Sequence, residues 1–500
     1  MIYSLDQKKP VVWTISGSDS GGGAGIQADL HTFQDFAVHG CSVITALTAQ
    51  NSFALGYCVA TERKSVVAQI NALDSDMPAA AIKLGMLANA EIIETVIKYL
   101  DDYSGFVVCD PVMFSTTGGS LLDEEGGALL REKLLPRIDL LTPNVLEAEA
   151  LTGLSIKTLD DVVIAAEAIL ALGARAVVVT GGHFDAQDGK RLDYWSDGKE
   201  ALWLAGEDIQ TINSHGTGCT LSSAITSAIA HGYDVKDALV IAKAYVTQGL
   251  RHSVQLGNGP GPVGHYGWPD AIEDLPTVST QLPDSAPQFA GCGEQLGLYP
   301  VVDSADWVAK LVDLGVTTIQ LRVEDKTEAQ LRDEISRSMT ACVDKNVRLF
   351  INDHWQLAIE LGAYGVHLGQ EDLDTADLNA IADAGLCLGV NTHSYYEIAR
   401  AHGLRPSYIA LGPVYETTAK ETKLSPLGLD QLEEWVDLLA DHYPLTAIGG
   451  ISYERVNDVL WTGISSCAMV TAITEADDYQ AVVTDLVERM RVLSVQELAD

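Results

Sequence analysis

Val-Val-Trp-Thr-Ile-Ser-Gly-Ser-Asp-Ser-Gly-Gly-Gly-Ala-Gly, residues 11–25, places a short apolar run directly before a glycine-rich turn. Such a run predicts a buried β-strand, and glycine lets the following chain turn tightly and approach a small ligand closely. Amphipathic segments such as 61–73 and 160–172 alternate with further apolar runs at 41–49, 80–85, 106–110, 138–142 and 176–180. This alternation predicts an α/β fold in which helices cover both faces of a mainly parallel sheet. Two long helical segments, 217–231 and 235–251, are expected to close this first domain.

A proline-rich stretch, 258–290, separates the two halves of the chain. It contains six of the sixteen prolines and shows no helical periodicity, which is typical of a linker. A chain of 500 residues also exceeds the usual size of a single hydrophobic core. We therefore expect a first domain at 1–265, a linker at 266–290 and a second domain at 291–500.

The second half repeats one pattern eight times. Amphipathic segments alternate with short β-rich apolar runs at 299–303, 317–322, 348–353, 365–369, 387–393, 408–414, 445–450 and 466–472. Eight strand–helix repeats within about 200 residues are typical of a compact (β/α)8 TIM barrel. An open doubly wound sheet would show the same alternation, and it is the alternative fold for this domain.

Composition narrows the range of partners. The formal net charge is −38, whereas a nucleic-acid-binding face needs clustered basic residues. No apolar run reaches the ~18 residues of a membrane span, and the N-terminus lacks a signal-peptide pattern. The eight cysteines lie far apart without a Cys-x-x-Cys pair, which suits reduced thiols. We expect a cytoplasmic protein with small-molecule substrates and no nucleic-acid or membrane partner; the sequence is also compatible with a homo-oligomer.

Two motifs of the first domain indicate phosphate chemistry. Residues 17–25 lack the Lys-Ser/Thr of a Walker loop and the spacing of a dinucleotide fingerprint, so a purely structural turn around Asp19 is the alternative interpretation. Residues 215–220, His-Gly-Thr-Gly-Cys-Thr, precede a predicted helix. The free N–H groups and the dipole of that helix would form an anion hole for a transferring phosphoryl group.

Three side chains near these motifs could carry chemistry. Cys219 lies at the positive end of the predicted helix, where we expect a lowered thiol pKa and a role as base. The alternative is a small buried cysteine without a chemical role. Asn144 and Glu147 follow the strand at 138–142 and have the spacing to orient a magnesium ion, although such a pair is often only a helix cap.

Polar residues of the second domain cluster where its predicted strands end, which is where barrel enzymes carry their catalytic groups. Asp353 and Asp372 follow adjacent strands, so both carboxylates are expected on one rim, where they could share a magnesium ion. Arg322 suits a bidentate contact with a phosphate. The remaining candidates are Gln320 and Asn352, with Gly449, Gly450 and Thr471 at the usual barrel phosphate site. Taken singly, each could be a cap, a turn or an ion pair.

The first domain contains Ile-Ser-Gly-Ser-Asp-Ser-Gly-Gly-Gly-Ala-Gly-Ile-Gln-Ala-Asp-Leu (15–30), Ala-Gln-Asn (49–51), Lys-Leu-Gly-Met (83–86), Cys-Asp-Pro-Val-Met (109–113), Thr-Pro-Asn (142–144) and His-Gly-Thr-Gly-Cys-Thr (215–220). Over about residues 10–265 it resembles the hydroxymethylpyrimidine/phosphomethylpyrimidine kinases of the ribokinase-like superfamily. The resemblance implies a ribokinase-like α/β domain. It also implies two successive ATP-dependent phosphorylations of 4-amino-5-hydroxymethyl-2-methylpyrimidine.

The resemblance also implies roles for residues of this chain. Cys219 would be the catalytic base, and Asp29 is assigned no chemistry. The anion hole would comprise Gly216, Thr217 and Gly218, the pyrimidine site Gln50, Met86, Gly17 and Asp19, and the magnesium and ATP contacts Asn144 and Glu147. Two departures concern the nucleotide, because relatives often carry a lysine near Thr116 and another at the position of Thr180.

The second domain contains Gln-Leu-Arg (320–322), Ile-Asn-Asp (351–353), Gly-Val-His-Leu-Gly-Gln-Glu-Asp (365–372), Gly-Pro-Val-Tyr (412–415) and Ile-Gly-Gly-Ile (448–451). Over about residues 291–495 it resembles thiamine phosphate synthase. That family joins the pyrimidine diphosphate to 4-methyl-5-(2-phosphooxyethyl)thiazole, and pyrophosphate leaves before the thiazole nitrogen captures the pyrimidine cation. The resemblance implies pyrophosphate and pyrimidine contacts from Gln320, Arg322, Asn352, Asn391 and Lys420, magnesium ligands Asp353 and Asp372, and thiazole-phosphate neighbours Thr417, Gly449, Gly450 and Thr471.

Three positions depart from the synthase pattern. Glu324 stands where a lysine is common, with Lys326 two residues further on; Asn391 replaces a serine, and Ala419 a threonine. An anion in place of a cation should weaken pyrophosphate binding by at least roughly 1 kcal/mol unless Lys326 or magnesium compensates.

The sequence as a whole predicts a bifunctional enzyme of thiamine biosynthesis with magnesium as cofactor and ATP as co-substrate. One alternative keeps the kinase but makes the barrel a non-synthetic regulatory or isomerase-like relative. A second is a pyridoxal-type kinase fused to a binding module, although Gln50 and Met86 favour a pyrimidine.

Overall fold

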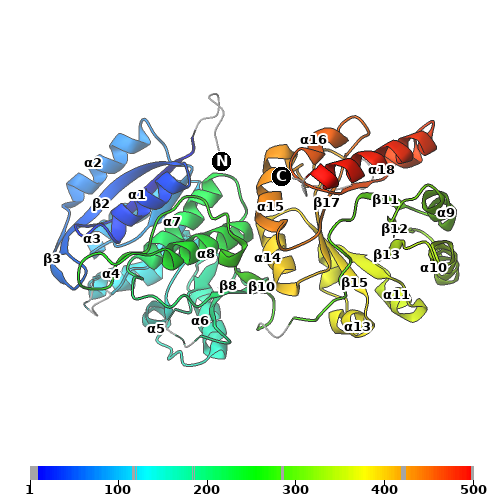
Figure 1. Cartoon of the computed structure of the whole chain (residues 1–500). Coiled ribbons are helices and arrows are strands. Elements are labelled where there is room, and N and C mark those ends of the chain that lie inside the picture. Colours follow the sequence, from blue (N-terminus) through cyan, green and yellow to red (C-terminus); the bar gives the residue numbers. More distant parts are fainter. Residues whose placement is uncertain are drawn as a thin grey trace. The chain divides into compact units, whose positions relative to one another are not determined.

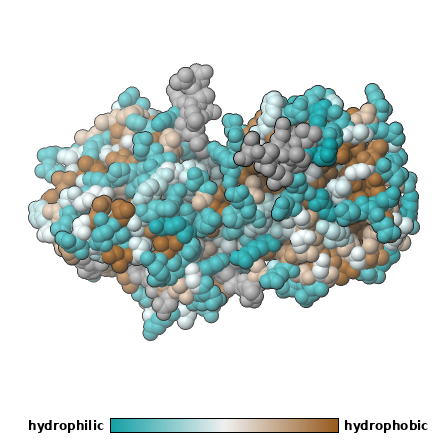
Figure 2. All heavy atoms as spheres, viewed as in Figure 1, coloured by the Kyte–Doolittle hydropathy of each residue, from teal (hydrophilic) through white to brown (hydrophobic). Residues whose placement is uncertain are grey.

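The structure is a computed structural model that describes residues 9–114, 119, 121–182, 184, 186–282, 286–417 and 424–496 (Figure 1). It consists of two compact units, Met1–Pro283 and Asp284–Asp500, which are considered separately below. Among the described residues, no helix is both long and apolar enough to cross a membrane. Hydrophilic residues dominate the face seen in Figure 2, with apolar residues scattered between them.

The first unit is built on one ten-stranded sheet in the order β10-β9-β8-β7-β6-β5-β4-β1-β2-β3. Six strands form the parallel part and confirm the predicted α/β fold: β1 (Val11–Asp19), β2 (His39–Gln50), β4 (Ala81–Leu84), β5 (Phe106–Cys109), β6 (Leu140–Leu141) and β7 (Val177–Val179). The sequence patterns did not reveal the antiparallel strands at the two ends of the sheet, which are β3 (Leu55–Ala60), β8 (Lys190–Ser196), β9 (Ala201–Glu207) and β10 (Thr277–Ser279).

Helices cover both faces of this sheet, as the alternation along β1 requires. Trp13 belongs to the core cluster that includes residues of α2, α3 and α6, whereas its neighbour Val12 packs with Phe33 of α1 and Ala230 of α7 on the other face. The helices are α1 (Gly25–Asp35), α2 (Arg63–Asp74), α3 (Ala90–Leu100), α4 (Glu124–Leu129), α5 (Val145–Thr152), α6 (Leu159–Ala171), α7 (Thr217–Ala230) and α8 (Val235–Arg251).

The proline-rich stretch that follows α8 packs largely on the first unit. The backbone of His215 pairs with that of Gly261 and Val263, at 3.1 Å in each case. Further along, β10 pairs with β9, and the buried carboxylate of Asp274 forms an ion pair with Arg251. Residues within 266–282 therefore contribute to the sheet and core of the first unit.

The second unit is a closed parallel barrel, which confirms the predicted TIM barrel and excludes the open sheet. Its strands are β11 (Leu298–Val302), β12 (Thr318–Leu321), β13 (Arg348–Asn352), β14 (Gly365–Leu368), β15 (Cys387–Thr392), β16 (Tyr408–Leu411), β17 (Leu445–Ile448) and β18 (Cys467–Met469). All eight lie within or next to the predicted apolar runs. Tyr299, Phe350 and Tyr408 are fully buried and lie in one core cluster with residues of the barrel strands.

Helices alternate with these strands and surround the barrel (Figure 1). They are α9 (Ala305–Asp313), α10 (Glu328–Cys342), α11 (Trp355–Leu361), α12 (Gln370–Leu373), α13 (Leu378–Asp383), α14 (Tyr395–Leu404), α15 (Gly428–Leu439), α16 (Val456–Leu460), α17 (Thr471–Thr474) and α18 (Tyr479–Gln496). The loops that leave the C-terminal ends of the strands carry the predicted polar residues of this domain.

Candidate active sites

The glycine-rich turn of the first unit is organised by the carboxylate of Asp19. Asp19 is buried and accepts hydrogen bonds from the backbone N–H groups of Gly21, Gly23 and Ala24, at 2.8, 3.1 and 2.9 Å. Burial raises its pKa, but the hydrogen bond to His215 and those from the backbone outweigh burial, so the pKa is lowered overall. Asp19 thus holds the loop in place as an ionised group.

Two glycines are required by close backbone contacts, one between this turn and the His-Gly-Thr-Gly-Cys motif and one within the turn. Gly216 caps α7 with a φ of +84°, and a Cβ there would lie 1.9 Å from the carbonyl oxygen of Gly23. Gly25 has a φ of +56°, and its Cβ would lie 2.3 Å from the carbonyl oxygen of Gly17. Both positions combine a left-handed backbone with a backbone contact that leaves no room for a side chain.

The two motifs border a cleft of about 1080 Å³. Every kinase residue singled out in the sequence lines it: Gly17, Asp19, Gln50, Met86, Asn144, Glu147, Gly216, Thr217, Gly218 and Cys219. A cleft of this size suits a small organic ligand together with a nucleotide.

Met86 and Gln50 lie close to the glycine motifs. A Cβ at Gly17 would lie 3.0 Å from the sulfur of Met86, so the absence of a side chain at residue 17 gives Met86 its place. The backbone of Met86 is held by Thr45, which donates to its carbonyl oxygen at 2.5 Å. Nε2 of Gln50 lies 3.1 Å from Nε2 of His215. An apolar sulfur beside amide and imidazole groups suits a small polar heteroaromatic ring.

Cys219 lies in the first turn of α7, but its thiol does not have the lowered pKa that the sequence predicted. Burial raises the pKa of Cys219 to about 12; Lys83 lowers it, whereas Asp110 and Asp29 raise it. The thiol and the carboxyl of Asp110 are hydrogen-bonded to each other. The expectation was wrong because it considered only the positive helix end, whereas desolvation and two buried carboxylates act in the opposite direction.

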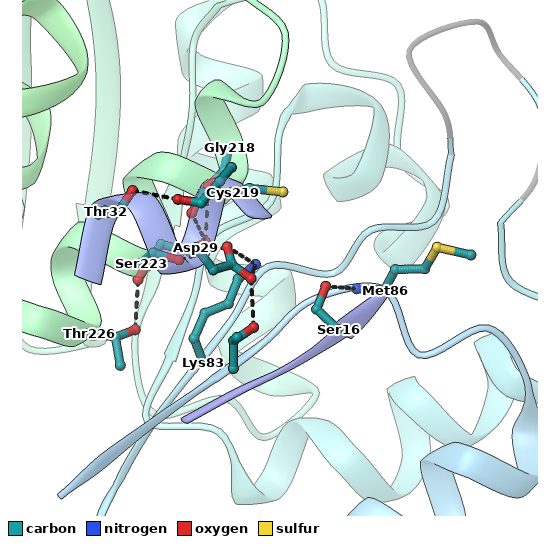
Figure 3. A network of polar contacts seen from close by, with 12 residues as sticks. Ser16, Asp29, Thr32, Lys83, Met86, Gly218, Cys219, Ser223 and Thr226 are labelled. Carbon is teal, nitrogen blue, oxygen red and sulfur yellow. Dashed lines mark hydrogen bonds and ion pairs between the residues drawn. The ribbon is translucent and has the colours of Figure 1, made fainter. Parts of the chain in front are cut away.

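A buried ion pair lies beneath this turn of α7. Nζ of Lys83 lies 2.8 and 3.0 Å from the two carboxylate oxygens of Asp29, and both side chains are fully buried. Asp29 also accepts hydrogen bonds from Thr14 at 2.6 Å and Ser223 at 2.7 Å. Figure 3 shows Lys83 and Ser223 reaching Asp29 from separate elements. Asp29 therefore connects α1, α7, β1 and β4 one helical turn away from Cys219.

Asp110 is a functional candidate that the motif analysis did not single out. It follows β5 at the carboxyl edge of the parallel sheet, and burial raises its pKa to about 6 although Lys83 lowers it. Burial, with the repulsion from Asp110, raises the pKa of Glu147 to about 8. The available signal was the position of this aspartate directly after a parallel strand, where ligands of α/β proteins bind.

Asn144 and Glu147 form a helix cap and at the same time line the cleft. Oδ1 of Asn144 accepts from the N–H of Glu147, and Oε2 of Glu147 accepts from the N–H of Asn144, both at 3.0 Å. Among the described residues, no group of three or more His, Cys, Asp or Glu side chains could hold a metal. The carboxylates of Asp110 and Glu147 repel one another, which fits a magnesium ion that keeps water and phosphate as its other ligands.

Only two lysine or arginine side chains line the described part of the cleft, and both are paired with carboxylates. Nε of Arg191 lies 2.6 Å from Asp208, and Nζ of Lys243 lies 2.6 Å from Asp193. Thr180 lines the cleft where relatives often carry a lysine. The other departure, near Thr116, falls outside the described residues. A polyphosphate would therefore meet few unpaired cations here, which increases its dependence on magnesium.

In the second unit, the structure brings together the residues predicted for the barrel rim. Asp353 and Asp372 share a side-chain hydrogen bond; burial and the negative charge of Asp372 raise the pKa of Asp353 to about 6, against the lowering effect of Arg322. Nδ2 of Asn352 donates to Asp353 at 2.6 Å. Two repelling carboxylates beside an arginine form a suitable oxygen-rich site for magnesium and pyrophosphate.

Glu324 forms an ion pair with Arg322, with 2.6 Å between its Oε1 and Nη2 of the arginine. Lys326, which could have compensated for this carboxylate, is instead paired with Glu334 at 2.7 Å. Lys420 and Ala419 fall outside the described residues. The positive charge of Arg322 at this rim is therefore partly neutralised by Glu324.

The remaining predicted residues lie on neighbouring loops and strands. Gly449 has a φ of +98° and Gly450 a φ of +65°; a Cβ at Gly450 would lie 2.4 Å from the carbonyl oxygen of Glu416, next to Thr417 in sequence. Thr471 begins α17 directly after β18. Gln320 and Asn391 lie on β12 and β15, with Gln320 buried and Asn391 half-buried.

Comparison with known proteins gives the same division. Residues 19–264 match the phosphomethylpyrimidine kinase family, and residues 298–473 match the thiamine monophosphate synthase family. A pyridoxal kinase from Staphylococcus aureus, solved in complex with AMP-PCP, is 31% identical, with a TM-score of 0.50; the match covers 55% of this chain and 99% of that one. A thiamine-phosphate synthase from Proteus mirabilis is 52% identical over 200 residues, which are 40% of this chain and 93% of the relative.

Similarity also extends over both units together. A probable thiamine biosynthetic bifunctional enzyme, chloroplastic, from Oryza sativa subsp. japonica is 33% identical over 488 residues, which are 95% of this chain and 87% of that protein. One from Arabidopsis thaliana is 33% identical over 96% of this chain and 92% of its own length. The chain belongs to the family of bifunctional thiamine biosynthesis enzymes, in which a hydroxymethylpyrimidine and phosphomethylpyrimidine kinase is fused to a thiamine-phosphate synthase.

Proposed function

We propose that the cleft of the first unit phosphorylates 4-amino-5-hydroxymethyl-2-methylpyrimidine and then its monophosphate, with ATP as donor. The pyrimidine would lie against Gln50, Met86 and Gly17, while Asp19 maintains the loop beside it. The N–H groups of Gly216, Thr217 and Gly218 would stabilise the transferring phosphoryl group, because they end a helix whose dipole favours negative charge. The relative that is solved with AMP-PCP supports ATP as the co-substrate.

The observation that carries this proposal is the position of Cys219 between the helix end and Asp110. Its thiol holds a proton in the unliganded cleft, so it would orient the substrate hydroxyl rather than ionise it in advance. Phosphoryl transfer needs little early proton removal, because the transition state is loose. Magnesium held by Asp110 and Glu147 would neutralise negative charge on the phosphate oxygens. It would also reduce the repulsion between the two carboxylates. Cys219 would then take the hydroxyl proton late in the transfer while its own thiol proton passes to the carboxylate of Asp110, to which it is hydrogen-bonded.

In the barrel, we propose that Arg322, Asn352 and Lys420 hold the pyrophosphate of the pyrimidine diphosphate. Asp353 and Asp372 would hold magnesium, which supplies the charge that a departing pyrophosphate needs. The glycine backbone at Gly449 and Gly450, with Thr417 and Thr471, would hold the phosphate of the thiazole. Relatives named thiamine-phosphate synthase at 50–54% identity give no support to a regulatory or isomerase-like barrel.

Complementation between two single-site variants of the full chain tests this division. Cys219→Ala should lack the kinase activity and Asp372→Ala the synthase activity, so neither alone should form thiamine phosphate from the unphosphorylated pyrimidine, ATP, magnesium and the thiazole phosphate. A mixture of the two proteins should restore product, because the diphosphate that one releases is the substrate of the other. Turnover by Asp372→Ala alone would contradict the ligand role of this residue.

We propose a cytoplasmic location for this chain, whereas the plant relatives are named chloroplastic. The sequence is also compatible with a homo-oligomer. Cell fractionation tests the first and sedimentation velocity the second. Pyridoxal belongs in the substrate panel, because pyridoxal kinases are among the structural relatives. Its phosphorylation at a rate above that of the pyrimidine would contradict the substrate proposed here.

A further inference from the structure

The carboxylate of Asp29 is buried outside the cleft and has no part in the proposed phosphoryl transfer. Its Oδ1 accepts hydrogen bonds from Ser223 at 2.7 Å and from Lys83 at 2.8 Å. All three residues are fully buried, and none of them lines the cleft. We call Asp29, Lys83 and Ser223 the buried anchor (Figure 3). Because no substrate can touch this anchor, any role in the reaction must act through its neighbours.

The buried anchor joins two elements that carry different parts of the proposed kinase site. Ser223 belongs to α7, whose first turn carries Cys219. Lys83 belongs to β4, and Met86 follows shortly after the end of this strand. Asp29 thus ties the helix with the proposed base to the strand that leads to the proposed pyrimidine contact.

Ser223 holds α7 from outside the helix. It lies one helical turn after Cys219, so the two side chains share a face of α7. Its hydroxyl donates to Asp29 of α1. Ser227, which is also buried on α7, instead donates to the carbonyl oxygen of Ser223 at 2.8 Å. A bond within the helix cannot fix the helix against its surroundings, whereas the bond from Ser223 to Asp29 can.

The first turn of α7 fits closely against its neighbours. A Cβ at Gly218 would lie 3.4 Å from the carboxylate of Asp110, and one at Gly216 would lie 1.9 Å from the carbonyl oxygen of Gly23. The thiol of Cys219 is hydrogen-bonded to the carboxyl of Asp110. A small rotation of α7 would therefore separate the thiol from Asp110 and move the N–H groups of the proposed anion hole.

The buried side chains of α7 are mostly small. Apart from Leu221 and Ile225, they are all threonine, serine or alanine. Small side chains make few interlocking contacts, so they fix the rotation of a helix less firmly than large ones. A directional hydrogen bond to a buried carboxylate adds the missing constraint, and the charge of the acceptor makes this bond strong.

We propose that Ser223 and Asp29 are positioning residues for the phosphoryl transfer. Their hydrogen bond fixes the rotation of α7, and the ion pair of Asp29 with Lys83 fixes the helix relative to β4. Cys219 and the anion hole are thereby aligned with the hydroxyl of a pyrimidine that lies against Met86. A misplacement of about 1 Å can reduce a rate roughly 100-fold. The proposal rests on the kinase function proposed for the first unit and identifies what holds its reacting groups in place.

Steady-state kinetics of Ser223→Ala in the full chain tests the proposal. ADP formation is measured with the unphosphorylated pyrimidine, saturating ATP and magnesium. We expect kcat to fall about 10-fold to 100-fold, because α7 loses its bond to Asp29. The KM for the pyrimidine should not change, because Gln50 and Met86 keep their places. A purely structural role of Ser223 would lower the stability of the first unit and leave kcat per folded molecule unchanged.

Two controls separate the place of this hydrogen bond from its contribution to stability. Thr14→Val removes a buried hydroxyl that donates to the same carboxylate from β1, at 2.6 Å. Ser227→Ala removes a buried hydroxyl of α7 that donates within the helix. Both variants should lower the urea midpoint of the first unit and retain the wild-type kcat. Urea unfolding of each variant also gives the folded fraction by which its kcat is corrected.

The outcomes distinguish this proposal from the kinase assignment. If the wild-type chain does not phosphorylate the pyrimidine, the kinase assignment fails and the proposal fails with it. If the wild-type chain is active, the proposal alone is overturned when Ser223→Ala keeps its kcat, loses no more of it than Thr14→Val and Ser227→Ala, or changes only in KM. A fall in kcat that is confined to Ser223→Ala, with an unchanged KM, would support the proposal.

Discussion

Arg322 and Glu324 form an ion pair of 2.6 Å at the barrel rim, beside the carboxylates of Asp353 and Asp372. The resemblance to thiamine phosphate synthase implies a lysine at the position of Glu324. In this chain a carboxylate stands there instead and forms an ion pair with Arg322. In the proposed synthase site, Arg322 would exchange this partner for the pyrophosphate when substrate binds. The side chain of Glu324 is largely exposed, which makes that exchange inexpensive.

Glu324→Gln should therefore improve the synthase. Without the competing carboxylate, the KM for the pyrimidine diphosphate should fall by about threefold to tenfold, as expected for ~1 kcal/mol of an exposed ion pair. The KM for the thiazole phosphate should not change. Steady-state kinetics at low ionic strength measures both. Glu328→Gln, which removes an exposed carboxylate on α10, controls for net charge, and an equal effect of the two variants would contradict a specific role for Glu324.

Gly216→Ala should abolish the kinase activity. The added Cβ would lie 1.9 Å from the carbonyl oxygen of Gly23, and the backbone has a φ of +84°, so the anion hole and the glycine-rich turn cannot keep their contact. Gly232→Ala is the matched control, because Gly232 has a φ of +94° but open space around its Cβ. It should cost about 1 kcal/mol of stability and retain the kinase activity. ATP consumption with the pyrimidine measures both variants, and equal losses would show that strain alone matters.

Lys83→Met should strongly destabilise the first unit. Removing Lys83 leaves the carboxylate of Asp29 buried and unpaired, which typically costs about 3–5 kcal/mol. The double variant Lys83→Met with Asp29→Asn should recover part of that loss, because the uncompensated charge is gone. Urea unfolding of the full chain, followed by a probe in the first unit, measures the change. Lys64→Met breaks an exposed pair with Glu62 and should have little effect; a similarly small effect of Lys83→Met would contradict the buried pair.

Magnesium should stabilise the first unit more at pH 8.5 than at pH 6. Burial and repulsion raise the pKa of Glu147 to about 8 and that of Asp110 to about 6, whereas the same groups in the unfolded chain lose their protons near pH 4. Between about pH 4 and pH 8 the native state therefore binds more protons than the unfolded state. Without metal, the free energy of unfolding should fall as the pH rises through this range. Magnesium requires the ionised carboxylates, so its effect should grow as those protons leave.

Melting temperatures of the first unit with and without magnesium chloride, from pH 5 to pH 9, test this dependence. Asp110→Asn removes the repulsion between the two groups, so Glu147 should ionise at lower pH and the magnesium effect should shrink. A magnesium effect that does not depend on pH, or that persists unchanged in Asp110→Asn, would place the metal elsewhere.

Much of the architecture could be predicted from one sequence pattern, the alternation of short apolar runs with amphipathic segments. The eight barrel strands and the six parallel strands of the first sheet are short apolar runs between amphipathic segments, and burial on both faces makes such runs recognisable. The strands that were not found are antiparallel and lie at the ends of the first sheet. β3 is mostly exposed, and β10 lies in a proline-rich stretch, so neither has the buried apolar signal on which the prediction depended.

Candidate site residues could be predicted where the residue type and its position in a motif indicate the chemistry. They could not be predicted where the chemistry depends on side chains that are distant in sequence but close in the fold. Gly216 and Asp353 were selected as candidates from motifs at helix and strand ends, and the structure places them at the cleft and at the barrel rim. The raised pKa of Cys219 arises from burial, to which Asp110 and Asp29 add from other elements. The pairing of Glu324 with Arg322 also requires side-chain geometry. Such effects depend on distances across the fold, which a single sequence does not contain.

The most direct test of two successive active sites uses Cys219→Ala in the full chain. Thiamine phosphate is measured once from the unphosphorylated pyrimidine with ATP, and once from supplied pyrimidine diphosphate, with magnesium and thiazole phosphate in both assays. We expect no product in the first assay and wild-type rates in the second, because Cys219 lines the cleft of the first unit, where we propose the kinase site. Wild-type product in the first assay, or equal loss in both, would contradict this division of the chain.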